Sequence, residues 1–163
     1  MKIGIVGPNK IFNDDERKRK ILLDEVARIV VASGNEIVLT PNKGSLLEYF
    51  GNKYLELGGK NISLVIPTME TGYEGYLNTS LGKIIDCCDW DRQADVYNRQ
   101  CDMFVCVGYA WDGMKEIACA QYFNAKKIYI LREFISNELP EELNFLVEYI
   151  SIKDLLSVLD VKS

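Results

Sequence analysis

Short apolar runs alternate along this chain with stretches in which apolar residues recur at helical spacing. The apolar runs predict six β-strands, at residues 2–6, 36–39, 61–66, 103–107, 127–131 and 144–150. The helical spacing predicts five helices, at residues 13–33, 46–57, 89–101, 112–124 and 151–159. Strands that alternate with helices pair in parallel through right-handed crossovers. We therefore expect an α/β fold: a three-layer, Rossmann-like sandwich with a mostly parallel sheet and helices on both faces.

Local signals fix several of these boundaries. Gly34 and the pair Gly58-Gly59 end two of the helices, and Ser45 with Glu48 has the S-x-x-E pattern of a capping box. Residues 68–91 are less regular, and within them residues 83–86 predict a short extra strand. Irregular segments of this length in compact domains are often functional.

Length and charge narrow the class of protein. The 163 residues fit one domain, residues 1–163, and the net charge of −5 argues against a broad nucleic-acid footprint. No apolar run reaches the ~18 residues of a membrane span, and the N-terminal segment lacks the apolar core of a signal peptide. We expect a cytoplasmic protein that contacts neither membrane nor nucleic acid.

Cysteine and histidine usage limits the chemistry. None of the five cysteines lies in a C-x-x-C pair, so we expect reduced structural thiols and neither a metal site nor a cofactor. Because the chain has no histidine, Ser-His and Cys-His catalysis are excluded. Any chemistry would depend on carboxylates, lysine, tyrosine or bound solvent.

The candidate site is the junction of the 103–107 strand with the helix that follows it. In an open parallel sheet, ligands bind beyond the carboxyl ends of the strands, and the turn after the first strand faces the same crevice. Glu116, placed in the first turn of the helix, is either a functional carboxylate or a residue that complements the helix macrodipole. The basic run 17–20 is either a solvated face or a source of positive potential at this crevice. The candidate ligand-binding residues are Gly7, Pro8, Asn9, Gly108, Tyr109, Ala110, Trp111, Asp112 and Gly113.

Three stretches carry a family resemblance: Gly58-Gly59 through Pro67, the Asp-Trp-Asp-Arg segment ending at Arg92, and residues 102–116. Together they resemble the Lonely Guy type phosphoribohydrolases and, more broadly, the nucleotide-binding Rossmann superfamily (SLOG) shared with the DprA proteins and the molybdenum-cofactor carriers. The resemblance implies Arg92 and Glu116 as the functional pair, a nucleotide or nucleoside ligand, and a homodimer.

The chain departs from the family pattern in its glycines. Where the family has P-G-G-x-G-T, this sequence has Gly-Tyr-Ala-Trp-Asp-Gly at 108–113, and the earlier glycine-rich loop is reduced to Thr-Pro-Asn-Lys-Gly-Ser at 40–45. Glycine lets a backbone lie against a phosphate, whereas a Cβ or a carboxylate crowds or repels it. The resemblance implies a nucleotide-binding protein that hydrolyses the N-glycosidic bond of a nucleoside 5′-monophosphate with a glutamate. Because the glycines are replaced, a non-catalytic binder or sensor of a nucleotide-like ligand is the alternative.

A second resemblance is to the nucleoside deoxyribosyltransferases, in which the first strand also ends in Gly-Pro, here Gly7-Pro8. Breaking an N-glycosidic bond needs a carboxylate near the anomeric carbon, because the transition state resembles an oxocarbenium ion. Glu116 would supply it, Arg92 would orient phosphate or ribose, and Tyr73, Tyr109 or Trp111 could stack on a base. An open pocket around Glu116 and Arg92 would favour catalysis, whereas a pocket filled by Tyr109 and Trp111 would favour a binder.

Overall fold

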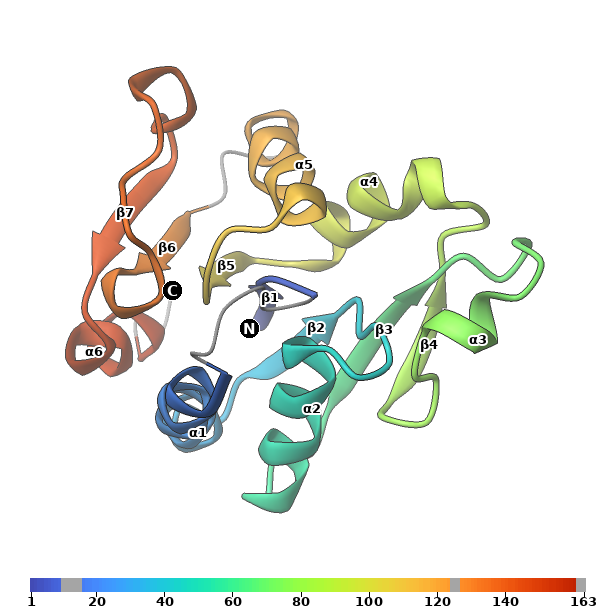
Figure 1. The fold of residues 1–163 in the computed structure, drawn as a ribbon, viewed down its shortest axis with the longest axis horizontal. Helices are drawn as coiled ribbons and strands as arrows, with labels where there is room; N and C mark the ends of the chain where they lie inside the picture. The colour runs from blue at the N-terminus through green and yellow to red at the C-terminus, as the bar shows by residue number, and fades with distance from the viewer. Residues whose placement is uncertain (10–15, 124–126, 161–163) are drawn as a thin grey trace.

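The computed structural model describes residues 1–9, 16–123 and 127–160, which form a single sheet of seven strands (Figure 1). The strand order is β4-β3-β2-β1-β5-β6-β7, and every pairing is parallel. The strands are β1 (Lys2–Val6), β2 (Glu36–Leu39), β3 (Ile62–Ile66), β4 (Lys83–Asp86), β5 (Met103–Cys106), β6 (Ile128–Leu131) and β7 (Val147–Ile150). The predicted α/β architecture is confirmed, as is the short extra strand at 83–86.

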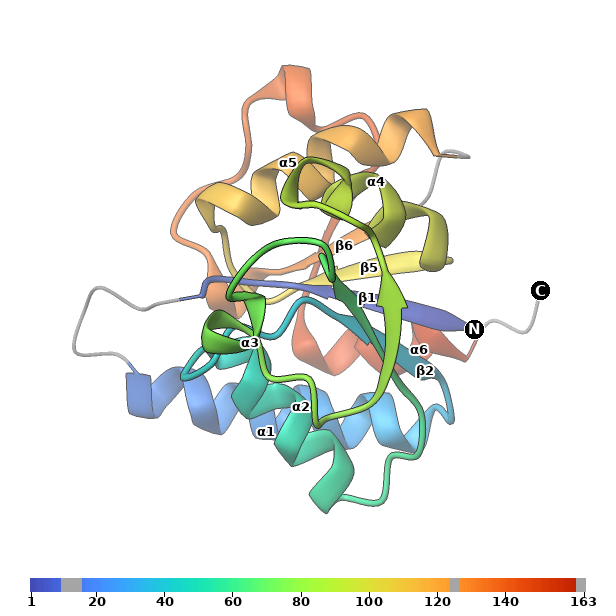
Figure 2. The same ribbon diagram turned by 90° about the vertical axis from the view of Figure 1, so that its right-hand side faces the viewer.

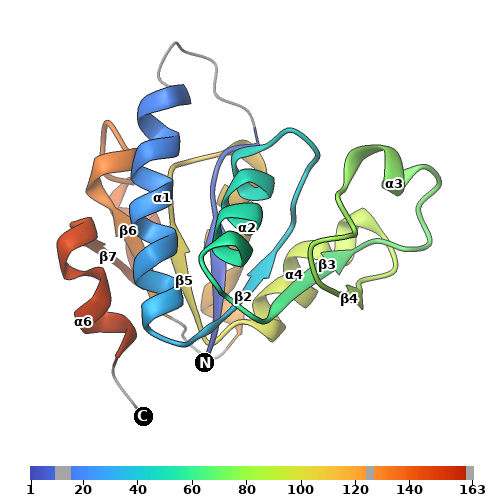
Figure 3. The same cartoon turned by 90° about the horizontal axis from the view of Figure 1, so that it is seen from below.

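Helices cover both faces of this sheet and give the three layers seen edge-on in Figure 2. One face carries α1 (Glu16–Ala32), α2 (Leu46–Glu56) and α6 (Leu155–Leu159), which Figure 3 shows side by side. The other face carries α4 (Trp90–Gln100) and α5 (Trp111–Cys119). One further turn, α3 (Tyr73–Tyr76), lies beside the loop before α2. Short 3-10 turns are η1 (Ala120–Tyr122), η2 (Arg132–Phe134), η3 (Glu141–Leu143) and η4 (Ile152–Asp154).

The strand order reverses between β1 and β5. From β1 the chain builds outward through β2, β3 and β4, and it then returns to place β5 on the other side of β1, where Val6 pairs with Cys106. Such a switch point leaves a crevice at the carboxyl ends of the two strands, because their loops run to opposite faces of the sheet. The predicted site residues at 7–9 and 108–113 lie at this point.

The two faces of the sheet have separate apolar cores, and a buried tyrosine joins one of them to the strands. Tyr97 of α4 is fully buried, and its hydroxyl donates to the carbonyls of Ile5 at 2.8 Å and Val38 at 3.2 Å. Burial raises the pKa of this tyrosine well above its usual range, so the hydroxyl stays protonated. It thereby fixes α4 over β1 and β2.

Several predicted boundaries move by a few residues. The helix expected at 112–124 begins at Trp111 and ends at Cys119, and the strand expected from 144 begins at Val147. The strand starts later than expected because Asn144 lies in a turn. Its side-chain amide donates to the Leu139 carbonyl at 3.1 Å and accepts from the Tyr149 hydroxyl at 2.8 Å. The predicted helix start at Asn13 and the helix end at Asn124 lie outside the described residues. None of the helices in the described ranges is long and apolar enough to span a bilayer.

Candidate functional site

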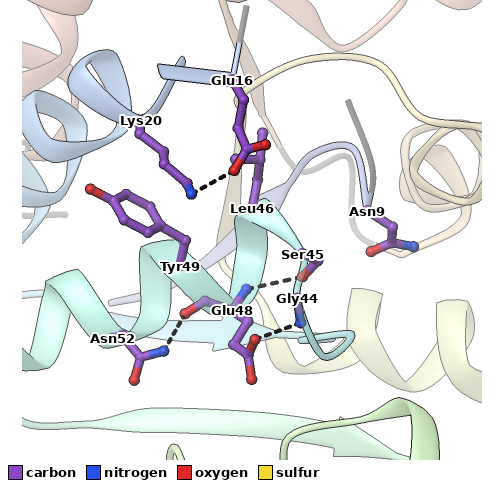
Figure 4. A pocket seen from close by; sticks show the side chains of 9 residues that line it. All are labelled: Asn9, Glu16, Lys20, Gly44, Ser45, Leu46, Glu48, Tyr49 and Asn52. Atoms are coloured by element: carbon purple, nitrogen blue, oxygen red, sulfur yellow. Dashed lines mark hydrogen bonds and ion pairs between the residues drawn. The ribbon is translucent and has the colours of Figure 1, made fainter. Parts of the chain in front are cut away.

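A pocket of about 380 Å³ opens beyond the carboxyl ends of β1 and β2, between the first turns of α1 and α2 (Figure 4). Its volume lies within the roughly 300–1,000 Å³ typical of small-molecule sites. Of the residues predicted to bind a ligand, Asn9 lines it. The lining residues are Asn9, Glu16, Lys20, Gly44, Ser45, Leu46, Glu48, Tyr49 and Asn52.

The α1 wall of the pocket carries a fixed cation. The Lys20 ammonium lies 2.5 Å from a carboxylate oxygen of Glu16, one helical turn earlier, and 5.1 Å from the centre of the Tyr49 ring. Both contacts are visible in Figure 4. An ion pair and a cation–π contact together orient the lysine, although each is worth only ~0.5–1 kcal/mol at an accessible site.

The α2 wall is held by the predicted helix cap. The Glu48 amide donates to the Ser45 hydroxyl at 3.1 Å, as the S-x-x-E pattern predicts. The Glu48 carboxylate accepts from the Gly44 amide at 2.6 Å and from the Asn78 side chain at 2.7 Å. In a capping box this carboxylate would accept from the Ser45 amide, but that amide donates to the Asn42 carbonyl at 3.0 Å. Glu48 therefore accepts from the amide of the preceding residue, Gly44. The loop before α2 is thus fixed at the pocket rim.

Tyr49 links the two walls. Its hydroxyl donates to the Asp24 carboxylate in α1 at 2.7 Å. Burial, followed by this hydrogen bond, raises the pKa of Tyr49 to about 12, so the phenol stays neutral at physiological pH. The ring keeps α1 and α2 at a fixed separation across the pocket.

The chemistry of the wall favours a polar ligand that is rich in hydrogen-bond donors. Glu16 and Glu48 are acceptors, Lys20 is a donor, and the amides of Asn9 and Asn52 are both. Sugar hydroxyls and the N–H edges of a heterocycle match carboxylate and amide oxygens. An isolated phosphate does not, because two carboxylates outnumber one ammonium.

A second cation lies next to the pocket, at the switch point. Arg19 of α1 donates from Nη1 to the Phe134 carbonyl at 3.2 Å, across the carboxyl ends of the strands. The same nitrogen lies 3.2 Å from the position that a Cβ atom would occupy if residue 108 carried a side chain. Of the basic run, Arg19 lies at the switch point and Lys20 lines the pocket, where Glu16 pairs with it. The interpretation that the run supplies positive potential at the crevice is therefore supported for Arg19. Arg17 and Lys18 are exposed.

The predicted glycines serve the packing of the crevice. Gly108 has φ of +123°, a conformation that side-chain-bearing residues rarely adopt. At Gly113 a Cβ would lie 2.8 Å from a methyl of Val6, so this glycine lets α5 pack closely on β1. Gly7 and Pro8 are buried at the end of β1, Ala110 is the N-cap of α5, and the side chain of Asp112 is outside the described part.

The two aromatic residues of the central loop point to different surroundings. Tyr109 is half-buried against the apolar cluster of the α4–α5 face, and burial, followed by its neighbour Tyr149, raises its pKa. Trp111, the first residue of α5, is 97% exposed. Tyr109 is therefore packed as apolar cover at this end of the sheet, whereas Trp111 is accessible to a ligand.

The proposed functional pair is not brought together at the pocket. Glu116 is only 9% exposed, its carbonyl accepts from the Asn98 side chain at 3.1 Å, and its charge contributes, after burial, to the raised pKa of Cys106. The prediction that Glu116 lies in the first turn was wrong, because α5 begins at Trp111 and Glu116 falls in the second turn. Neither Glu116 nor Arg92 lines the 380 Å³ pocket.

Arg92 lies on the surface at the start of α4. Its guanidinium is 3.5 Å from the Asp89 carboxylate, and its amide donates to the same carboxylate at 3.0 Å as part of the N-cap. With a side chain that is 66% exposed, this ion pair contributes ~0–1 kcal/mol at most.

Sequence reasoning missed most of the pocket. Tyr49, Asn52 and Glu16 were not expected to bind a ligand, and Ser45 and Glu48 were recognised only as a cap. The signal that could have found them is their position. Glu16 and Lys20 are four residues apart on α1, and Tyr49 and Asn52 are three apart on α2, so each pair shares a helix face. Both pairs lie near the starts of helices that follow two adjacent parallel strands. Among the described residues, no three His, Cys, Asp or Glu side chains gather so that they could hold a metal ion.

No protein-family model and no curated protein matches this sequence. Solved structures, however, share its fold over nearly the whole chain. The molybdenum cofactor binding protein from the phototrophic bacterium Rippkaea orientalis has a TM-score of 0.74 at 13% identity, covering 96% of this chain and 93% of that one. The structural-genomics target TM1055 has a TM-score of 0.75 at 16% identity, with 98% of each chain covered. The Moco carrier protein from Chlamydomonas reinhardtii has a TM-score of 0.75 at 16% identity, covering 96% and 93%. The likeness confirms the Rossmann-like fold that the sequence resemblance implies.

Proposed function

We propose that this protein binds a small nucleotide-like ligand in the crevice at the carboxyl ends of β1, β2 and β5, and that it acts as a binder or carrier. The observation that carries the proposal is the 380 Å³ polar pocket beside the switch point, with Arg19 next to it. Open α/β sheets bind ligands at this position. Two of the structural neighbours are named for binding or carrying the molybdenum cofactor, and the proposal includes a ligand of that kind.

The chemistry of the crevice suggests how such a ligand would lie. Its hydroxylated or heterocyclic part would occupy the pocket, where Glu48, Asn52 and Asn9 offer acceptors and amide donors. Its anionic end would face Arg19, since this guanidinium lies at the switch point, where it donates to the Phe134 carbonyl. The exposed Trp111 is placed to stack on a flat ring.

A thermal-shift screen tests the proposal. The purified protein is screened against nucleosides, nucleoside monophosphates, pterins and ribose 5-phosphate. A ligand present at 100 times its Kd stabilises by ~2.7 kcal/mol, which is readily detected. Asn52→Leu should weaken the best ligand about tenfold by removing polar contacts, worth ~1.4 kcal/mol. Asn137→Leu, on the surface away from the pocket, is the matched control. The absence of a shift with every compound would contradict the proposal.

A second candidate function is hydrolysis of the N-glycosidic bond of a nucleoside monophosphate. The supporting observation is the burial of Glu116, because a carboxylate held away from bulk water is the group that this chemistry needs. Arg92 would have to leave Asp89 to orient a phosphate. The same ligand mixtures, separated by chromatography, would show free base with the wild type and none with Glu116→Gln. Binding without release of free base would support the carrier function and contradict hydrolysis.

Two further proposals follow from the resemblances. Transfer of deoxyribose between bases would require the same Glu116, and a second free base in the reaction would then yield a new nucleoside. A homodimer is expected from the family resemblance, and light scattering at micromolar concentration would give a mass of twice 18.6 kDa. A mass of one chain would remove that expectation.

A further inference from the structure

A second cavity, of about 480 Å³, lies at the opposite ends of the strands from the proposed ligand pocket. It opens at the amino ends of β1 to β4, where the chain enters these strands. Three lysines line it, together with one carboxylate and several neutral polar groups. The lining residues are Lys2, Glu36, Lys60, Asn61, Ile62, Ser63, Leu81, Gly82, Lys83, Ile85 and Gln100.

Strand register places the polar residues on one face of the sheet. Lys2 pairs with Glu36, and Ser63 of β3 pairs with Lys83 of β4. In parallel strands, paired residues point to the same side, and so do residues two apart along one strand. Ser63 therefore lies on the face that α4 covers, next to Lys83.

The C-terminal end of α4 lies at this cavity, because the helix ends at Gln100 and Gln100 lines the cavity. The chain then turns directly into β5 through Asp102, whose carboxylate accepts from the Lys2 amide at 2.7 Å.

Ser63 offers this cavity an accessible hydroxyl. The residue is only 9% exposed, it lines the cavity, and its hydroxyl has no hydrogen-bond partner within residues 1–9, 16–123 and 127–160. The hydroxyl oxygen does not belong to the fully buried polar atoms that lack a partner, so it is open to the cavity. It can therefore donate a hydrogen bond to a ligand oxygen there.

The charges around Ser63 specify the ligand. The side chains of Lys2, Lys60 and Lys83 have no ion pair with any described residue, whereas the Glu36 carboxylate accepts from the Asn61 side-chain amide at 2.9 Å. Three ammonium groups against one carboxylate give a local positive potential in a chain of net charge −5. The carbonyl end of α4 opposes this potential, but a helix terminus carries only ~0.5 of a unit charge.

We infer that this cavity is a second binding site, which takes a small oxyanion with at least two negative charges, such as a phosphate ester or a polycarboxylate. The Ser63 hydroxyl and the Gln100 amide donate to its oxygens, and the three lysines balance its charge. Because the two cavities lie at opposite ends of the strands, this site and the nucleotide-like site can be filled together.

Pyrophosphate and citrate are the probes for this site. They are titrated into 15N-labelled protein at constant ionic strength, and backbone amide signals are followed. The expected result is a saturable shift at Ser63, Lys83 and Gln100 with one of the probes or both. Removing two of the charge contacts, in the double variant Lys60→Gln/Lys83→Gln, should weaken binding at least about tenfold. Ser63→Ala should weaken binding several-fold, while the spectrum remains that of the folded protein.

The matched control is Lys153→Gln, an exposed lysine in η4 that does not line the cavity. It should leave the affinity unchanged. Linear, unsaturating shifts spread over many lysine neighbourhoods would mean that the anions only screen surface charge, and this would overturn the inference. An equal loss of affinity in Lys153→Gln and the double variant would do the same. Binding of nucleotides at the carboxyl edge is a separate readout, so either site can fail without the other.

Discussion

The Arg19 guanidinium of α1 lies 3.2 Å from the position that a Cβ would take on Gly108, at the end of β5. The first helix thereby reaches across the switch point to the loop after the fifth strand, and it also donates to the Phe134 carbonyl at 3.2 Å. A side chain at position 108 would therefore crowd this cation.

Gly108→Ala should therefore destabilise the protein. The backbone φ of +123° is unfavourable for alanine, and the new methyl would crowd Arg19 and Pro8. Such strain costs ~1–3 kcal/mol. At ~2–4 °C per kcal/mol, the melting temperature should fall by several degrees. Gly75→Ala, where a Cβ meets no neighbour and φ is not positive, is the control and should change it by no more than about one degree. Equal melting temperatures for the two variants would contradict the strained geometry.

Tyr49 should give the protein a measurable alkaline sensitivity. Burial, followed by the hydrogen bond to Asp24, raises its folded-state pKa from 10.0 to about 12. The neutral phenol therefore contributes stability that is fully present below pH 10 and is lost as pH rises through about 12. Tyr49→Phe removes this contribution. The stability difference between wild type and variant, measured by urea unfolding from pH 8 to pH 12, should shrink over the upper two units. A difference that is constant with pH would show that the pKa of Tyr49 is not raised in the folded protein.

Ser45→Ala should loosen the pocket rim. The hydroxyl caps α2 by accepting from the Glu48 amide, and loss of an N-cap costs ~1 kcal/mol. Amide hydrogen exchange should accelerate in the first turn of α2, at residues 46–48, and remain unchanged in α4. Ser136→Ala, at an exposed serine outside any helix cap, should affect neither. If Ser45→Ala had the same exchange as wild type, Glu48 alone would suffice to hold the loop.

Elements with strong local signals were predictable from the sequence. The β3 residues 62–66 are all buried, as expected of a strand inside a parallel sheet, and the Ser45 cap follows from four residues of sequence. The switch point could also be predicted, because apolar strands alternating with helices leave few topologies. The family resemblance gave the same fold.

The pocket could not be predicted in the same way. Tyr49 and Asp24 are 25 residues apart, and their contact depends on the packing of α1 against α2, which no local spacing specifies. Tyr109 and Trp111 lie two residues apart and looked equivalent in the sequence. Tyr109 precedes α5 and packs on the apolar cluster, whereas Trp111 is the first residue of the helix and lies in solvent. The family resemblance points to Glu116 and Arg92, whereas the 380 Å³ pocket lies at the neighbouring ends of β1 and β2.

Trp111 provides a direct reporter for ligand at the switch point. At 97% exposure it should emit near the wavelength of tryptophan in water and be readily quenched by acrylamide. Trp90→Phe isolates this signal, because the chain has two tryptophans and Trp90 is 40% exposed. If a flat ligand ring stacks on Trp111, saturating ligand should lower the acrylamide quenching constant about twofold or more, since base–aromatic stacking is worth ~1–3 kcal/mol and shields one face of the ring.

Trp111→Ala should then weaken the same ligand by about tenfold or more, with an unchanged melting temperature for the free protein, because an exposed side chain contributes little to stability. A ligand that binds with full affinity to Trp111→Ala would show that the tryptophan faces solvent in the bound state too, and that the pocket between α1 and α2 holds the ligand alone.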